Sequence, residues 1–289
     1  MSTITVNGKQ YDKATSAREA TAIAQDIAKN ARLLDSPLPA DVDFSPAEEK
    51  ELQTQLNALA VLPPEGVRNR LYNAFTAFHL PALINTLRTL NPRTQPIAFA
   101  NMVQIFSLLG EPQQNPYLRR FLKKGENVAG IPTLIAAEFV HGIAWKRPSG
   151  PGYICSLMCH LLQFCDVSLG DDGESSIDVA VRKPFAEKVA QLSQMMGTNE
   201  DLDTFQRVEI MRLDGILGMM EHIGGPPGYY LTSTRDHLRG SSGDDICTVC
   251  MEDSTLTCSR CKTVRYCGQK CQKQDWKAGH KLACFQTTY

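Results

Sequence analysis

The sequence predicts a mainly α-helical protein with a small cysteine-rich domain near its end, and three observations lead to this prediction. Apolar residues recur at three- and four-residue spacing through most of residues 1–223. Gly, Pro, Ser and Asp then cluster at residues 224–245, which is typical of a flexible linker. Seven of the ten cysteines lie beyond that linker. We therefore expect a helical domain over 1–223, a linker over 224–245 and a cysteine-rich domain over 246–289.

The first elements are predicted from turn signals and apolar spacing. The segments TITV and KQY flank Asn7-Gly8, a dipeptide that favours the tight turn of a β-hairpin. Two short strands alone are only marginally stable, so we expect the hairpin to be a minor part of the fold. After it, apolar residues at helical spacing predict a helix over residues 16–34.

A capping signal predicts where the second helix begins. Ser45 is an N-cap residue, Pro46 occupies the first helical position, and Glu48 completes a capping box. Apolar spacing predicts further helices over 67–78, 81–90, 97–109, 133–145, 153–165, 184–196 and 203–222. Most of their joins contain Pro or Gly, and no fixed-period repeat occurs. We expect either an irregular helix bundle or a HEAT- or armadillo-like stack.

The bulk composition narrows the class of protein. Hydrophobic residues make up 43% of the 289-residue chain, but no apolar run reaches the ~18 residues of a membrane span. The first residues lack the basic and apolar segments of a secretory signal. We therefore expect an intracellular protein, in the nucleus or the cytoplasm. In reducing compartments, clustered cysteines are more often metal ligands than disulfides.

The cysteine-rich domain contains eight residues of ligand type. Their spacing is C-x2-C-x7-C-x2-C-x5-C-x3-C-x8-H-x3-C, and they are Cys247, Cys250, Cys258, Cys261, Cys267, Cys271, His280 and Cys284. Eight ligands make two sets of four, the number that structural Zn²⁺ takes. We expect two zinc ions, held by two C-x2-C turns and two short helices with i,i+4 ligand pairs. A disulfide-bonded knot or a group of buried thiols is the alternative, but seven is an odd number of cysteines and a histidine lies where an eighth ligand is needed.

The side chains of this domain carry a positive net charge, as nucleic-acid-binding domains do, but bound zinc with its thiolate ligands lowers that charge. From Ile246 onward there are seven Lys and Arg against three Asp and Glu, a net charge of +4. Seven thiolate ligands and two Zn²⁺ ions lower that charge to +1. Nucleic-acid-binding domains usually carry a clear positive excess, so a nucleic-acid partner is not expected.

The array and its surroundings resemble the MYND-type zinc finger. The matching features are the eight ligands in order, Tyr266-Cys267, Cys271-Gln272, Asp275-Trp276 and the closing His280-x3-Cys284. The resemblance implies cross-braced pairing, with one zinc held by Cys247, Cys250, Cys267 and Cys271 and the other by Cys258, Cys261, His280 and Cys284. Spacing alone leaves a sequential pairing open. The preceding region resembles that of fungal MYND-finger proteins, a weaker likeness from which we infer no function.

MYND-type fingers mostly bind proteins, commonly short proline-rich peptides. The resemblance implies that Ser259, Gln272 and Trp276 form the peptide-binding groove. Gln272 and Trp276 have i,i+4 spacing and would face the same way on a helix. Trp offers a flat apolar surface to proline, and Gln can hydrogen-bond the carbonyls of an extended chain. The alternative is that Trp276 only packs over the zinc cluster.

The helical region carries one cluster of chemistry-bearing residues. Cys155, Cys159 and His160 precede Cys165 in a strongly apolar run, which favours a buried helix over a third metal site. No Rossmann, Walker, kinase or methyltransferase motif is found, so we do not expect an enzyme. The predicted function is a zinc-binding protein-interaction adaptor in transcriptional or chromatin regulation. An enzyme with a catalytic site in the helical region and a nucleic-acid-binding protein are the alternatives.

Overall fold

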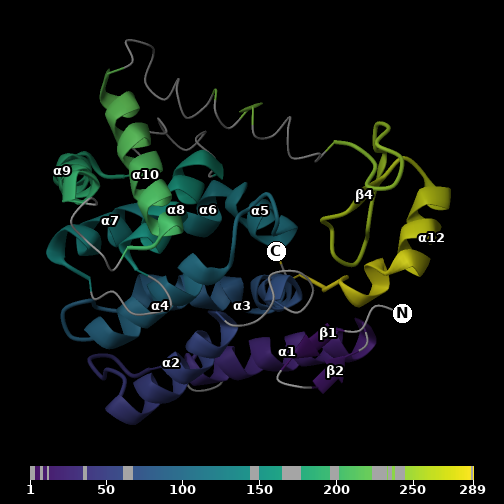
Figure 1. The fold of residues 1–289 in the computed structure, drawn as a ribbon, viewed down its shortest axis with the longest axis horizontal. Coiled ribbons are helices and arrows are strands. Elements are labelled where there is room, and N and C mark those ends of the chain that lie inside the picture. The colour runs from purple at the N-terminus through teal and green to yellow at the C-terminus, as the bar shows by residue number, and fades with distance from the viewer. Residues whose placement is uncertain are drawn as a thin grey trace.

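A computed structural model of the chain confirms the predicted fold class, with a helical body and a small C-terminal finger (Figure 1). The turn at Asn7-Gly8, Trp145, Cys165 and nearly all of the 224–245 linker lie outside the residues that it describes. The structure describes residues 4–6, 9–11, 13–34, 38–60, 68–143, 150–164, 177–195, 202–222, 233, 236–237, 245–287 and 289.

The N-terminal elements agree with the turn and spacing signals. Strands β1 (Ile4–Val6) and β2 (Lys9–Tyr11) pair antiparallel, with Ile4 opposite Tyr11. Helix α1 (Lys13–Asn30) follows directly and places its buried face against helix α3. The predicted hairpin and the first helix are therefore confirmed, although α1 begins three residues earlier than expected.

Helix α2 (Pro46–Ala60) begins at the predicted capping box. The backbone N–H of Ser45 donates to Glu48 Oε2 at 2.9 Å, and the Ser45 hydroxyl donates to the same oxygen at 2.6 Å. The Glu48 backbone N–H in turn donates to the Ser45 hydroxyl, with nitrogen and oxygen 3.4 Å apart. The Ser45 hydroxyl, followed by the Arg32 guanidinium, lowers the pKa of Glu48 to about 2.

Helix α3 (Asn69–Thr89) corrects the prediction of two helices at 67–78 and 81–90, because it runs unbroken through Pro81. A proline inside a helix loses one backbone hydrogen bond and costs ~3 kcal/mol. Leu80, Leu83, Ile84 and Leu87 are buried on either side of it. Burial of an apolar side chain contributes ~1.5–3 kcal/mol, so packing outweighs the local cost.

Two short helices were not predicted from the sequence. Helix α4 (Pro96–Leu108) was expected, but α5 (Pro116–Leu122) and α6 (Gly125–Val128) follow it. The side chain of Asn115 caps α5 by accepting the Leu118 backbone N–H at 3.0 Å. The Asn115-Pro116 pair is a start signal that would have identified α5.

The remaining body helices lie in the second half of the body. Helix α7 (Ile131–His141) stops before the predicted Trp145 because Gly142 adopts the left-handed conformation, with φ 86°, that ends helices. The others are α8 (Pro151–Phe164), α9 (Val179–Met195) and α10 (Thr204–His222). Helix α10 packs on α8 and α9, while α3 packs on α1 at the other side of the body (Figure 1). No described helix has both the length and the hydropathy that a membrane span requires.

The finger consists of strands β3 (Leu256–Thr257) and β4 (Arg265–Tyr266), helix α12 (Gln269–Ala278) and the 3₁₀ helix η3 (His280–Leu282). In Figure 1 it lies beside α1, α3 and α5, and its helix α12 is on the side that faces away from the body. The finger is thus seated on the body, and its long helix points outward.

Candidate metal centres and their seat on the body

The first metal centre, called site 1, contains Cys247, Cys250, Cys267 and Cys271. The Cys250 sulfur lies 3.4 Å from that of Cys267 and 3.8 Å from that of Cys271. The sulfurs of Cys267 and Cys271 are 3.5 Å apart, and all four sulfurs lie within 4.8 Å of one another.

The second metal centre, called site 2, contains Cys258, Cys261, His280 and Cys284. The sulfurs of Cys258 and Cys284 are 3.6 Å apart. The imidazole Nε2 of His280 lies 3.4 Å from the Cys258 sulfur and 3.7 Å from the Cys261 sulfur. All four ligand atoms lie within 4.8 Å of one another, and Nε2 is the ring nitrogen that faces the sulfurs.

Both centres fit zinc. A tetrahedral zinc with Zn–S bonds of ~2.3 Å separates its sulfurs by ~3.8 Å, close to the distances found here. A disulfide would hold two sulfurs at ~2.05 Å, and no disulfide joins any of the nine cysteines that the structure describes. The finger therefore carries two zinc sites, and each ion would have four protein ligands. The cross-braced arrangement is confirmed, and the sequential alternative is excluded by the positions of the ligands.

The two C-x2-C pairs lie in tight turns, as the spacing predicts. The Met251 backbone N–H donates to the Cys247 carbonyl at 3.0 Å, and the Lys262 N–H donates to the Cys258 carbonyl at 2.8 Å. Each turn ends in the left-handed region, with φ 64° at Met251 and 54° at Lys262. These turns place both sulfurs of each pair on one side of the backbone, where a single metal can bind them.

The two predicted ligand-bearing helices are only partly present. Cys267 lies before α12, because Gly268 is extended and acts as the N-cap. Cys284 lies beyond η3, which is a single 3₁₀ turn, and Gly279 with φ 150° separates η3 from α12. The i,i+4 spacing thus correctly predicts which ligands share a metal, but a helix end separates each pair.

A carboxylate lies beside the histidine ligand, near the ring nitrogen that does not face the sulfurs. Asp275 Oδ2 accepts a hydrogen bond of 2.7 Å from the Tyr266 hydroxyl and lies 3.9 Å from His280 Nδ1. Because Nε2 faces the sulfurs, Nδ1 is left to carry the proton and to face this carboxylate. Burial, followed by this carboxylate, raises the pKa of Tyr266, so its hydroxyl stays a donor. Tyr266 is fully buried, so its ring packs in the interior of the finger.

Polar groups on α5 connect the body to site 2. The Tyr117 hydroxyl donates to the Ala283 carbonyl at 2.9 Å and accepts the Phe285 backbone N–H at 2.9 Å. Arg120 Nη1 donates to the carbonyl of the ligand Cys261 at 3.1 Å and to the Thr287 hydroxyl at 2.8 Å. We call this set of contacts, together with the aromatic contacts described next, the seat of the finger.

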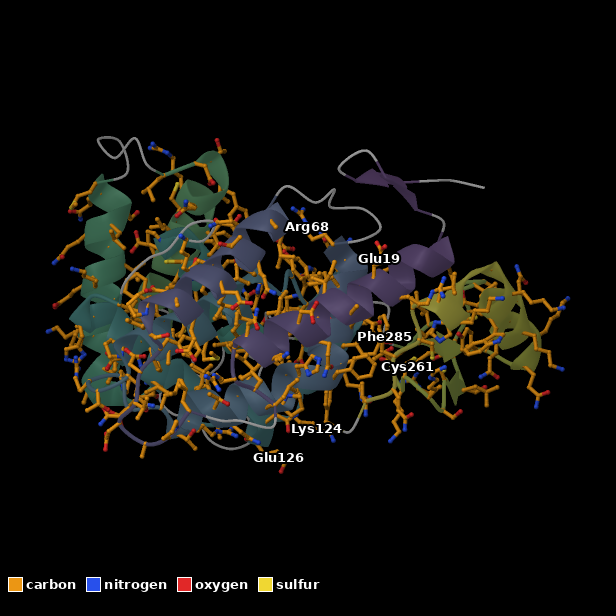
Figure 2. The ribbon with its side chains drawn as sticks, turned by 90° about the horizontal axis from the view of Figure 1, so that it is seen from below. Glu19, Arg68, Lys124, Glu126, Cys261 and Phe285 are labelled. Carbon is orange, nitrogen blue, oxygen red and sulfur yellow. The ribbon has the colours of Figure 1, made fainter. Side chains whose placement is uncertain are left out.

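Aromatic rings complete the seat. The Phe285 ring lies 5.6 Å from that of Phe78 on α3 and 5.9 Å from that of Tyr117. The Tyr289 ring meets Phe121 edge-on at 4.9 Å, and its hydroxyl donates to the Thr76 carbonyl at 3.0 Å. Figure 2 labels Cys261 and Phe285 where the finger meets the body. Sequence analysis missed the seat, and the only hint of it was the pair of aromatic residues after the last ligand.

The three residues of the expected peptide groove lie in the finger. Gln272 and Trp276 are both on α12, and Ser259 is exposed in the second C-x2-C turn. The Trp276 side chain is 39% exposed, and its ring lies 5.9 Å from that of His280. The ring therefore touches site 2 and also presents a surface to solvent.

The cysteines of α8 are packing residues. Cys155, Cys159 and His160 are buried, and burial raises the pKa of Cys159 to about 12. Burial also lowers the pKa of His160 to about 3. In the described part of the chain, the two finger clusters are the groups of Cys, His, Asp and Glu that could hold a metal.

Comparisons with known proteins agree with this geometry. The family model described as MYND finger matches residues 247–284. Ubiquitin carboxyl-terminal hydrolase 19 of Arabidopsis thaliana is 48% identical over 64 residues, which are 22% of this chain and 9% of that protein. Programmed cell death protein 2 of Mus musculus is 46% identical over 50 residues, or 17% and 15% of the two chains. These relatives share the finger only, and no solved structure matches the chain.

Proposed function

Because residues 247–284 form a MYND finger with two zinc sites, we propose that this chain is a protein-interaction adaptor whose finger binds proline-rich segments. Two saturated zinc sites leave no open coordination position for water or substrate, so the metals support structure rather than hydrolysis. The catalytic activity named for the plant relatives is not extended to this chain, since the match covers 9% of the hydrolase.

The exposed ring of Trp276 is the observation that carries this proposal. It lies on α12, the helix that faces away from the body, so the seat of the finger leaves it accessible (Figure 1). Gln272 stands one turn earlier on the same helix and is half-buried. An aromatic face beside an amide is the combination that binds the rings and carbonyls of a proline-rich chain. Ser259 supplies an exposed hydroxyl from the neighbouring zinc turn.

A role in transcriptional or chromatin regulation, in the nucleus or the cytoplasm, belongs to the same proposal. It is supported by the resemblance to MYND fingers, which commonly recruit other proteins. The near-neutral charge of the zinc-loaded finger favours a protein partner over nucleic acid. The body would then hold the finger and offer a second surface.

The proposal is tested with a panel of labelled peptides, each rich in proline, beside the same peptides with proline replaced by alanine. We expect the zinc-loaded chain to bind some of the former and none of the latter, measured by fluorescence polarisation. Trp276→Ala and Gln272→Ala should weaken binding, whereas Gln274→Ala, an exposed control on the same helix, should not. Loss of zinc from the Trp276→Ala chain would show that the Trp276 ring stabilises the zinc site rather than binding peptide. Unchanged peptide binding by both groove variants would reject the proposed groove.

A further inference from the structure

A cavity of about 320 Å³ lies in the helical body, where the ends of several helices meet. Its walls come from α2, α3, α4, the loop that precedes α5, α8 and α10. Figure 2 labels one lining residue, Arg68, on the body and apart from the finger. The volume is that of a site for a small molecule, which usually spans ~300–1,000 Å³. The cavity is thus separate from both zinc sites and from the proposed peptide groove.

Five polar side chains that line this cavity have no partner in the described part of the protein. They are half-buried, and no hydrogen bond or ion pair to a described residue engages their side chains: Arg68, Asn69, Tyr72, Asn73 and Tyr153. None of the five has a polar atom that is both buried and without a partner, so their polar ends remain open to the water of the cavity. They are therefore available to hydrogen-bond a ligand that enters it.

The described lining of the cavity carries one charge of each sign. Arg68 is the one basic residue and Glu111 the one acidic residue among the described lining residues, and Glu111 lies on the loop before α5. Burial raises the pKa of Tyr72 to about 12 and also raises that of Tyr153. The Asp203 charge adds to the shift of Tyr153, and the nearby Arg68 charge opposes both shifts, so the guanidinium acts on both phenols. The cavity therefore offers one cation beside two phenolic donors, and the carboxylate of Glu111 lies on the loop before α5.

An aromatic wall lies beside these donors. The rings of Tyr153 and Phe205 are 4.8 Å apart at 53°. Phe205 is 39% exposed although it lines the cavity, so part of its ring has no protein contact. Such a pair of rings packs well against a flat apolar group.

We propose that this cavity binds a small organic anion that carries a carboxylate or a phosphate on a flat ring. Arg68 binds the charged group, with hydrogen bonds from the Tyr72 and Tyr153 hydroxyls, and the ring packs on Phe205. Asn69 and Asn73 bind polar substituents. The adaptor would then carry a small-molecule site in its body.

The test is calorimetric titration of the full zinc-loaded chain with four probes that share one ring. Phenyl phosphate and phenylacetate carry the anion, benzylamine carries a cation, and benzyl alcohol is neutral. We expect at least one anion to bind about tenfold or more tightly than benzylamine and benzyl alcohol. The two anion arms distinguish a phosphate site from a carboxylate site. Equal affinity for all probes, or no binding of either anion at millimolar concentration, would overturn the proposal.

Variants assign the binding to the cavity. Arg68→Gln should abolish the preference for the anions, and Tyr72→Phe should weaken anion binding while keeping the ring. Arg93→Gln is the matched control, because Arg93 lies elsewhere on the body and pairs with Glu138 at 3.3 Å. An unchanged urea midpoint shows that a variant is folded. If a folded Arg68→Gln or Tyr72→Phe chain binds the anions as the wild type does, the site is not this cavity.

Discussion

The two zinc sites have similar ligand geometry, yet their surroundings differ. Site 1 is more exposed, with Cys247 buried, Cys250 exposed, and Cys267 and Cys271 half-buried. In site 2 all three cysteines are buried, and the His280 side chain is only 6% exposed. Site 2 is also contacted by the body, through the bond from Arg120 to the Cys261 carbonyl. Site 2 is therefore part of the joint between the finger and the body, whereas site 1 lies on the more exposed side of the finger.

Removing one ligand from each site gives the largest expected effect. Structural zinc contributes on the order of 10 kcal/mol to the folding of a small finger. We expect Cys250→Ser and Cys261→Ser each to lose one zinc per chain, measured by elemental analysis. Only Cys261→Ser should also weaken the seat, because loss of zinc from site 2 would loosen the turn whose Cys261 backbone carbonyl accepts the bond from Arg120.

Hydrogen exchange separates these two outcomes. After Cys261→Ser, the amides of α5 and of residues 283–287 should exchange faster, since the Tyr117 and Arg120 contacts would be lost. After Cys250→Ser, faster exchange should be confined to the finger. Equal protection of the α5 amides in the two variants would mean that loss of zinc from site 2 does not affect the body. The proposed difference between the two sites would then be wrong.

The seat itself can be weakened without touching a ligand. Tyr117→Phe removes the hydroxyl that bonds both the half-buried Ala283 carbonyl and the buried Phe285 N–H. The buried N–H is then left unpaired, at a cost of ~1–3 kcal/mol. We expect a chromogenic chelator to remove one of the two zincs faster from this variant, by about tenfold. Substitution with ¹¹³Cd distinguishes the all-cysteine site 1 from the histidine-containing site 2 by separate resonances, and site 2 should be the one affected.

Tyr72→Phe is the matched control for zinc release, because the Tyr72 hydroxyl bonds no described residue and Tyr72 is not part of the seat. Its two zincs should leave at the wild-type rates. If Tyr117→Phe also released both zincs at wild-type rates, the contacts of the seat would not stabilise zinc binding at site 2.

The sequence predicts the interior of each unit better than the joint between them. Local signals correctly predict the start of α2, where Ser45 and Glu48 cap each other, and the ligands, whose spacing fits only certain turns. They fail at Pro81, where buried neighbours outweigh a local helix-breaking residue. They also fail at the seat, because Tyr117 and Ala283 are 166 residues apart and no local pattern connects them. Tertiary packing decides both cases.

The smallest expected effect is a loss of stability on acidification, caused by His79 in the body beside the seat. The His79 ring packs 6.1 Å from that of Phe78, which in turn contacts Phe285 of the seat. Burial lowers the pKa of His79 to about 4, from 6.5, so folding favours the neutral ring. The resulting stabilisation is complete above pH ~6.5 and is lost as the pH falls from there towards 4. Between pH 7.5 and 5.5 the loss is ~1 kcal/mol.

This loss should appear as a lower urea midpoint of the helical circular-dichroism signal at pH 5.5, with zinc in excess. In His79→Leu the part of the decrease due to His79 should vanish, because the apolar side chain has no proton to gain. His141→Gln, a change at a 54% exposed side chain, should keep the wild-type pH dependence. If His79→Leu loses as much stability on acidification as the wild type, then groups other than His79, such as buried His160 and the zinc ligands, cause the decrease.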